Sequence, residues 1–212
     1  MRPLHELILL LVVLTDFWVL GTTRLSSMIR ATAIQGALLA TLPVALSSHP
    51  SVHILGLAAG TLLVKAFVLP YFLSRAIREA AVRREIQPLI GFTASVILGA
   101  AAVALAFAIA SRLVLPGVQS DLLVPVALST VIIGLIVLTT RNKAVTQVVG
   151  YLVLENGIYT FGMSQAERVP FLVDLGVLLD VFVGVFIMGI VVFHINREFD
   201  SLDSTRLTEL RD

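Results

Sequence analysis

The sequence predicts an all-α integral membrane protein with about seven transmembrane helices. Of its 212 residues, 58% are hydrophobic and 14% are charged, whereas about a quarter of the residues of a soluble domain are charged. Crossing the hydrocarbon core of a bilayer takes about 20 apolar residues. Seven stretches of the chain reach or nearly reach this length. Basic residues gather in alternate connections between these stretches, as the positive-inside rule requires.

The seven stretches follow one another with short polar breaks between them. Their approximate cores are Leu4–Leu20, Met28–Leu46, Val52–Leu73, Leu89–Ala110, Leu122–Leu138, Ala144–Met163 and Phe171–Ile195. We interpret the first as a retained helix, because no small-residue cleavage site follows Leu20. The third continues into Ser74–Glu85, whose mixed charges suit either a solvated loop helix or a helix on the lipid headgroups. The fourth has no ionisable side chain, and its small residues favour close helix packing.

The distribution of lysine and arginine predicts the orientation, because cytoplasmic loops retain basic residues. One side of the predicted bundle carries eleven of them, namely Arg24, Arg30, Arg75, Arg78, Arg83, Arg84, Arg141, Lys143, Arg197, Arg206 and Arg211. The opposite side carries only Arg2, Arg112 and Arg168. We therefore expect an outside N-terminus, a cytoplasmic C-terminus and a multi-pass position in the cell's inner membrane.

Composition also excludes several classes of function. The net charge is +1 and the basic residues form no single patch, which argues against a nucleic-acid partner. The chain has no cysteine, so disulfides, thiolate nucleophiles and iron–sulfur ligation are excluded. Of the four histidines, only His49 and His53 have helical spacing, and Pro50 breaks that geometry. We expect no buried metal or redox centre made by this chain alone.

Four ionisable residues inside predicted helices are the candidate functional residues. Counting 1.5 Å of rise per residue places Lys65, Glu155 and Asp180 at depths of roughly 13–20 Å, near the bilayer midplane. Asp174 belongs near the outer interface. A charged residue at the centre of a transmembrane helix costs about 2.5–3.5 kcal/mol even on insertion scales, so such residues are functional candidates by default.

A lysine and two acids at one depth suit proton transfer. An ammonium and a carboxylate lower the cost of each other's burial. Apolar surroundings disfavour the charged form of a carboxyl group, so it can load and release a proton. Bridged by water, these groups would form a proton route parallel to the membrane.

Structural interpretations remain open for each candidate. Glu155 and Asp180 can serve as interhelical hydrogen-bonding groups, and Lys65 can extend its ammonium toward the interface. Asp174 and Asp16 lie nearer the interfaces, where a hydrated carboxylate is cheap.

Two further patterns concern packing. Tyr151 and Tyr159 share a helix face with Glu155, where their hydroxyls can bond the carboxylate or their rings can pack against a partner helix. Glycines of the last two predicted helices favour close approach of neighbouring helices. They are Gly150, Gly157, Gly162, Gly176, Gly184 and Gly189.

The segment Gly150–Gly157, followed by Val173–Gly176 and Asp180, resembles the hydrogenase-4 component E family. These proteins are membrane subunits of group 4 nickel–iron hydrogenases and formate hydrogenlyases. Thr61–Lys65 followed by Pro70 fits the same pattern, so the resemblance covers most of the chain. The last three predicted helices are similar in turn to the K subunit of bacterial complex I and to the matching subunit of cation/proton antiporters.

The resemblance implies a division of the chain and a role for two acids. Residues 1–115 would form a four-helix membrane extension, residues 116–199 a K-subunit-like unit of three helices, and residues 200–212 a cytoplasmic tail. Each of two K-subunit helices contributes a glutamate to a line of proton-transfer residues. Asp180 matches the second glutamate. The first falls at Leu152, whereas the acid here is Glu155, one helical turn further on and about 4.5 Å away along the axis.

The function implied is that of a non-catalytic membrane subunit of a complex-I-like, hydrogenase-type oxidoreductase. Glu155 and Asp180 would pass protons, Lys65 would adjust their proton affinity, and Asp174 would connect the path to the outer side. The chain would hold no cofactor, and the nickel–iron and iron–sulfur centres would belong to partner subunits. The implied partners are antiporter-like membrane subunits, a quinone-subunit-like membrane anchor and peripheral hydrogenase-like subunits. A purely structural anchor and a cation/proton antiporter subunit remain alternatives.

Overall fold

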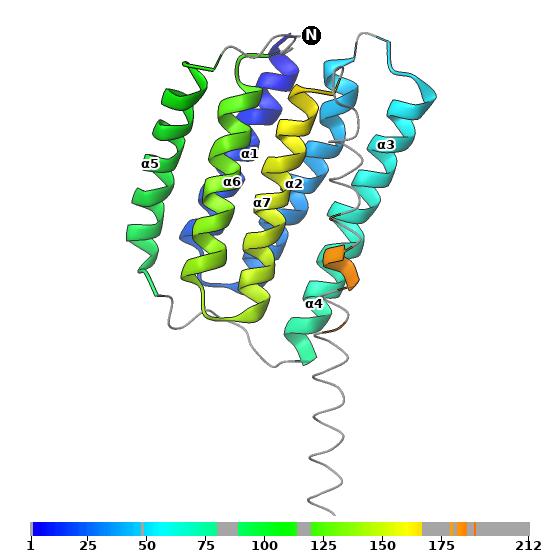
Figure 1. The fold of residues 1–212 in the computed structure, drawn as a ribbon. Coiled ribbons are helices and arrows are strands. Elements are labelled where there is room, and N and C mark those ends of the chain that lie inside the picture. Colours follow the sequence, from blue (N-terminus) through cyan, green and yellow to red (C-terminus); the bar gives the residue numbers. More distant parts are fainter. Residues whose placement is uncertain are drawn as a thin grey trace, which may run out of the picture.

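The computed structural model describes residues 2–47, 49–79, 89–113, 120–166, 179, 182–185 and 189. The regular elements of this part of the chain are helices, namely α1 (Arg2–Gly21), α2 (Leu25–Leu46), α3 (Val52–Leu62), the π-helix η1 (Leu63–Val68), α4 (Leu69–Glu79), α5 (Phe92–Ala110), α6 (Leu123–Thr140) and α7 (Ala144–Ser164). They run up and down in a bundle, with α1, α2, α6 and α7 in the middle and α5 and α3 at opposite edges (Figure 1).

Six of the seven predicted helices fall on the described residues, and each is confirmed as a helix. The third continues past its predicted core, which ends at Leu73, to Glu79, within the segment Ser74–Glu85 where a helical continuation was expected. The seventh predicted helix, Phe171–Ile195, lies outside the described residues except for 179, 182–185 and 189, and so does the tail of residues 200–212.

Five of the helical segments are long and apolar enough to cross a membrane. They are Leu4–Gly21, Leu25–Leu46, Val52–Arg78, Phe92–Ala110 and Leu123–Thr140. Helix α7 is equally long but less hydropathic, because it carries Gln147, Glu155 and Asn156. Its two central polar side chains, Glu155 and Asn156, are buried inside the bundle. The described residues therefore confirm an all-helical fold with five helices long and apolar enough to cross a membrane, while the number of crossings and their direction stay predictions.

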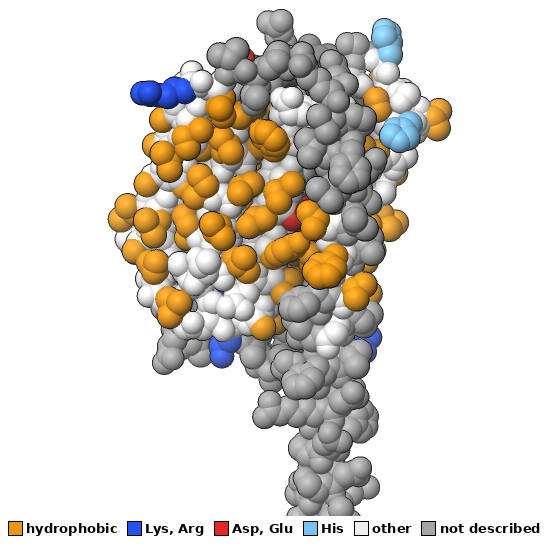
Figure 2. Space-filling model, in the orientation of Figure 1, with side chains coloured by type: hydrophobic (Ala, Val, Ile, Leu, Met, Phe, Trp, Pro, Cys, Tyr) orange, Lys and Arg blue, Asp and Glu red, His pale blue; other side chains and the backbone are white. Residues whose placement is uncertain are grey.

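The outer surface has the polarity of a lipid-facing surface. Figure 2 shows hydrophobic side chains over the middle of the bundle, with basic side chains near its two ends. Large apolar residues are exposed along α1 and α5, among them Leu7, Leu14, Ile97 and Leu105. Exposed apolar area on this scale is unusual for a soluble monomer.

Most of the described basic residues lie toward one end of the bundle. The turns from α1 to α2 and from α6 to α7 meet there, together with the end of α4 (Figure 1). The residues at this end are Arg24, Arg30, Arg75, Arg78, Arg141 and Lys143. Arg112 follows α5 at the opposite end. We call the end that carries these six residues the basic end.

Glycines set the close packing of α6 against α7. A Cβ atom at Gly157 would lie 2.6 Å from the backbone nitrogen of Val131, and one at Gly150 would lie 2.5 Å from that of Leu138. No real Cβ atom fits at such distances, so the two backbones touch at these glycines. The predicted packing role of Gly150 and Gly157 is confirmed.

The small residues of α5 pack as predicted, against α1 and α6. The buried positions of this helix are Ser95, Gly99, Ala102 and Ala106. Their spacing of three and four residues places them on one face. A Cβ atom at Gly99 would collide with Leu20 of α1, so this helix too depends on a glycine for its approach.

The segments α3, η1 and α4 form one continuous helical stretch that contains a π turn. The backbone N–H of Leu69 donates to the carbonyl of Val64, five residues earlier. Pro70 follows directly, and a proline has no N–H and crowds the carbonyl four residues before it, here that of Ala66 within η1. Widening the helix by one residue before Pro70 accommodates this crowding.

The glycine contacts predict that a glycine-to-alanine substitution lowers stability in α7 but not in α3. We expect Gly157→Ala to lower stability by about 1–3 kcal/mol, the usual cost of overpacking a core. The matched control is Gly56→Ala in α3, because nothing lies within 4 Å of a Cβ atom built there. The thermal midpoint of the purified full chain in detergent micelles measures both, and equal midpoints for the two variants would contradict the contact assigned to Gly157.

Candidate functional site

Lys65 lies in the middle of the long helix Val52–Glu79, on the π turn, and only 5% of its surface is exposed. Helix α2 passes directly against it, because a Cβ atom at Gly36 would lie 2.6 Å from the Lys65 Cβ. The ammonium therefore stays in the bundle, and its proposed extension toward the interface is wrong. Single π turns inside α-helices occur frequently at functional sites.

A buried ion pair joins Lys65 to Glu155 of α7. The Lys65 Nζ donates to Glu155 Oε2 and also to Asn156 Oδ1, at 2.9 Å. The Glu155 side chain has no exposed surface. Removing two charges from water is expensive, so a buried pair persists only with good geometry and additional hydrogen bonds. Asn156 supplies one such bond.

The hydrogen bonds continue from Asn156 to a second buried acid. Asn156 Nδ2 donates to Gln35 Oε1 of α2 at 2.9 Å, and Gln35 Nε2 donates to Asp16 Oδ1 of α1 at 2.7 Å. Thr130 Oγ1 of α6 donates to Asp16 Oδ2, also at 2.7 Å. Asp16 is completely buried. We call Glu155, Lys65, Asn156, Gln35, Asp16 and Thr130 the buried polar chain.

This arrangement corrects the interpretation of Asp16 as a hydrated residue near the interface. Helices α2 and α6 cover its carboxylate with Gln35 and Thr130. Neither partner was predicted from the sequence. The available signal was a glutamine within an apolar helix, directly before the glycine that contacts Lys65.

The two tyrosines of α7 differ in their roles. Tyr159 is completely buried, and the Lys65 Nζ lies 5.5 Å from the centroid of its ring. At this distance the ring face attracts the ammonium by a cation–π interaction. Tyr151 is half-buried and lines a separate pocket.

A cavity of about 10 Å³ adjoins the ion pair. Its lining residues are Thr32, Lys65, Leu69, Pro70, Leu152 and Asn156. This volume is close to the minimum that holds one water molecule. Because Leu69 follows Lys65 in a helix that runs toward the basic end, and Leu152 precedes Asn156 in one that runs away from it, the cavity lies on the basic side of Lys65.

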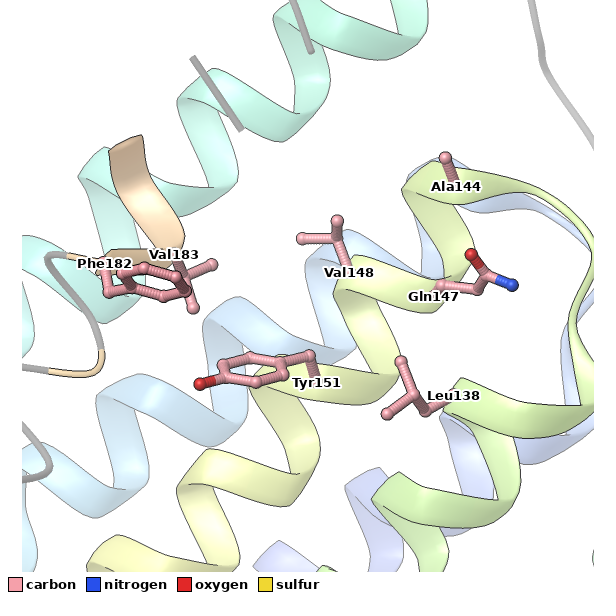
Figure 3. Close-up of a pocket in the computed structure, with 7 residues that line it drawn as sticks. All are labelled: Leu138, Ala144, Gln147, Val148, Tyr151, Phe182 and Val183. Carbon is pink, nitrogen blue, oxygen red and sulfur yellow. The ribbon is translucent and has the colours of Figure 1, made fainter. Parts of the chain in front are cut away.

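A larger pocket of about 330 Å³ opens beside the end of α6 and the first turns of α7. It is lined by Leu138, Ala144, Gln147, Val148, Tyr151, Phe182 and Val183. Figure 3 shows the Tyr151 ring extending across it from α7, with the hydroxyl on the side where Phe182 lies. Its lining is mostly apolar and includes no member of the buried polar chain, so it is suited to a hydrocarbon chain rather than to an ion.

Arg141 was predicted as a loop residue, but only 1% of its surface is exposed. Its Nη2 donates to the Leu20 carbonyl at 3.1 Å and its Nη1 to the Ile90 carbonyl at 3.3 Å. Its Cζ lies 4.6 Å from the centre of the Phe92 ring. A cation suits the last turn of α1, whose carbonyl groups have no helical partner. Arg141 thus ties together the ends of three helices.

The remaining predicted residues and metal ligands can be placed only in part. Asp174 and Asp180 lie outside the described residues. Among the residues that are described, no three His, Asp or Glu side chains gather so that they could hold a metal ion. The location of the metal centres in partner subunits stays a prediction.

Comparison with known proteins identifies relatives along most of the chain. It is 36% identical over 204 residues to Mycobacterium tuberculosis Rv0085, a protein whose name states no function, and the match covers 94% of this chain and 92% of that protein. It is 27% identical over 157 residues to hydrogenase-4 component E of Escherichia coli K12, covering 73% and 72%. The Shigella flexneri component E gives the same values. No family model and no solved structure matches.

The buried ion pair predicts a non-additive pattern of stability. We expect Lys65→Met or Glu155→Leu alone to cost about 3–5 kcal/mol, because each removes one partner of a buried ion pair. The double variant should be more stable than either single one. Thermal midpoints of the purified full chain measure the cycle, with Arg112→Met as an exposed control. Additive losses would show that the two residues do not interact.

Proposed function

The chain belongs to the same family as Rv0085, and from its homology to hydrogenase-4 component E we propose that it is a membrane-arm subunit of a multi-subunit, hydrogenase-type oxidoreductase. In this proposal its buried charged residues form part of a proton path. Redox chemistry in partner subunits drives proton movement along that path. The observation that supports this function is the buried Lys65–Glu155 ion pair in the middle of two membrane-length helices.

The ion pair can take up and release a proton without any other chemistry. While Lys65 and Glu155 are in contact, the ammonium stabilises the carboxylate. If a movement of the assembled complex separates them, the carboxylate loses the ammonium that stabilises it in apolar surroundings, and the neutral acid becomes more favoured. Glu155 then binds a proton, which it releases when the contact forms again. A small displacement of one helix is enough for this cycle.

The path proposed for the whole chain extends beyond the described residues. Asp180 is the second proton acceptor, and Asp174 connects the path to the outer side. The organisation retained in this proposal has seven membrane crossings with the N-terminus outside, a four-helix part (residues 1–115), a K-subunit-like part (116–199) and a cytoplasmic tail (200–212). The inner membrane is the proposed location.

The proposed partners follow from the same homology. They are antiporter-like membrane subunits, a quinone-subunit-like membrane anchor and peripheral hydrogenase-like subunits that hold the nickel–iron and iron–sulfur centres. The redox module is of the hydrogenase or formate hydrogenlyase type.

One observation favours a structural anchor as the second candidate function. The buried polar chain links α1, α2, α6, α7 and η1 by directional hydrogen bonds. Such a network specifies how helices assemble whether or not it carries protons. Neutralising the acids distinguishes the two functions. A proton-path subunit would lose proton pumping, whereas a structural anchor would lose assembly and keep the pumping of each assembled complex.

Neutralising the two proposed proton acceptors tests the proposed function. We expect Glu155→Gln and Asp180→Asn each to lower redox-coupled proton pumping of the assembled complex about 10²-fold, the lower range for loss of an acid–base group. Proton uptake by inverted membrane vesicles, divided by the amount of complex on a native gel, measures this. Glu6→Gln is the control, because Glu6 is exposed near the start of α1. Normal pumping per complex with reduced assembly would support the structural anchor.

The position of the acid along α7 gives a second test. Leu152 lines the cavity that also contacts Lys65, so a glutamate at this position would reach the ammonium from the basic side. We expect Leu152→Glu to restore a substantial part of the pumping that Glu155→Leu removes. The control is Leu152→Gln with Glu155→Leu, which has the same shape without the charge. Equal pumping by the two double variants would contradict a role for the acid in proton transfer.

A further inference from the structure

The described core contains two buried carboxylates but one ammonium to balance them. Lys65 contacts Glu155, whereas Asp16 makes hydrogen bonds only to Gln35 and Thr130. No Lys, Arg or His of the described chain lies within ion-pair distance of Asp16. With both acids ionised, this region would carry an uncompensated negative charge in apolar surroundings. Such a charge is removed most easily by binding one proton.

The helices packed against α1 supply no alternative counter-ion. Helix α5 has no ionisable residue, and α6 has none before Arg141 follows it. The guanidinium of Arg141 donates to two backbone carbonyls, as described above. Arg30 of α2 is exposed, and on α1 itself His5 and Glu6 lie about three turns from Asp16.

The direction of the hydrogen bonds decides where a proton on Asp16 can lie. An ammonium only donates, so Asn156 must present its oxygen to Lys65 and its amide N–H to Gln35. Gln35 therefore presents its oxygen to Asn156 and its N–H to Asp16 Oδ1. The same amide group also donates to the Val12 carbonyl at 3.4 Å, which favours this orientation. Asp16 Oδ1 is thus an acceptor.

The second carboxyl oxygen has a more permissive partner. Asp16 Oδ2 faces the hydroxyl of Thr130 at 2.7 Å. A hydroxyl can both donate and accept. It can donate to an ionised Asp16, and after rotation it can accept from a protonated one.

We propose that Asp16 is a second proton-holding site, with its proton on Oδ2, and that Asn156 and Gln35 couple it to the charge of Lys65. The proton comes from water and neutralises the carboxylate, so no other reactant is needed. If Lys65 passes its own proton to Glu155, the amine gains a lone pair and both amides can turn over. Gln35 then offers its oxygen at Asp16 Oδ1, so Asp16 must be protonated and its carboxyl group must turn over as well, which brings the O–H to Gln35 and leaves an acceptor for Thr130.

The proton on Asp16 and the charge on Lys65 are therefore linked. An ionised Asp16 permits only one orientation of the two amides, the same one that a charged Lys65 requires. A protonated Asp16 permits both. Such linkage is reciprocal, so a change at either end biases the other. This inference rests on the proposed function only where it places Asp16 in the proton path. Whether Asp16 holds a proton can be measured independently of that function.

Infrared difference spectroscopy of the purified full chain in lipid nanodiscs measures the proton directly. We expect a carbonyl-stretching band of a protonated carboxyl group at neutral pH that Asp16→Asn removes. Asparagine keeps an oxygen for Gln35 and an N–H for Thr130, so the fold should persist. The control is Thr15→Val, because the neighbouring buried hydroxyl bonds only to the Val12 carbonyl and lies outside the buried polar chain.

Two further variants test the origin of the band and the coupling. Thr130→Val should shift the band without removing it, because the hydroxyl partner of Oδ2 is lost. Glu155→Gln should alter the Asp16 band in the wild-type background but not beside Asn156→Leu, which interrupts the amide link. A spectrum with no band that depends on Asp16, or a change with Glu155→Gln that is the same with and without Asn156, would overturn the proposal.

Pumping by the assembled complex separates this inference from the proposed function. We expect Asp16→Asn and Glu155→Gln both to lower pumping severalfold or more, and Thr15→Val to leave it unchanged. If Glu155→Gln lowers pumping and Asp16→Asn does not, the place of Asp16 in the path is overturned while the proposed function stands. If neither lowers pumping, the proposed function itself fails, and the infrared band still decides whether Asp16 holds a proton.

Discussion

The burial of one ammonium group determines much of the interior of this bundle. Lys65 can only donate hydrogen bonds, so every acceptor around it is oriented by its charge. Glu155 balances that charge, and Asn156 turns its oxygen toward it. The orientation passes through Gln35 of α2 to Asp16 of α1. Helices that share no direct ion pair are thereby joined through a single cation.

The backbone makes this arrangement possible. Glycine at position 36 lets α2 lie against the Lys65 stem, and glycines 150 and 157 let α7 lie against α6. The π turn before Pro70 widens the helix at Lys65 itself. Small residues at helix contacts are the usual device of membrane proteins, because lipid gives no hydrophobic drive toward association. Close contact matters here because hydrogen bonds of 2.7–2.9 Å tolerate little separation of the helices.

The sequence predicted the helices and the common level of Lys65 and Glu155 well and predicted partners poorly, for a physical reason. Apolar length defines a transmembrane helix, and residue counting gives height, so Lys65 and Glu155 were expected at one level and are in contact. Height does not give the direction in which a side chain points. Asp16 was assigned to water and Arg141 to a loop because their enclosure depends on α2, α6 and α1 meeting around them. Amide partners such as Gln35 become visible only when the helices are assembled.

The displaced acid of α7 is explained by the same geometry. The sequence resemblance led us to expect this acid at Leu152, and both Leu152 and Asn156 border the cavity beside Lys65. The Lys65 ammonium thus faces two successive turns of α7. A lysine side chain is long enough to meet an acid on either turn, and the π turn fixes its height independently of α7. The position of the base therefore constrains the site more than that of the acid, which leaves the acid free to occupy position 155.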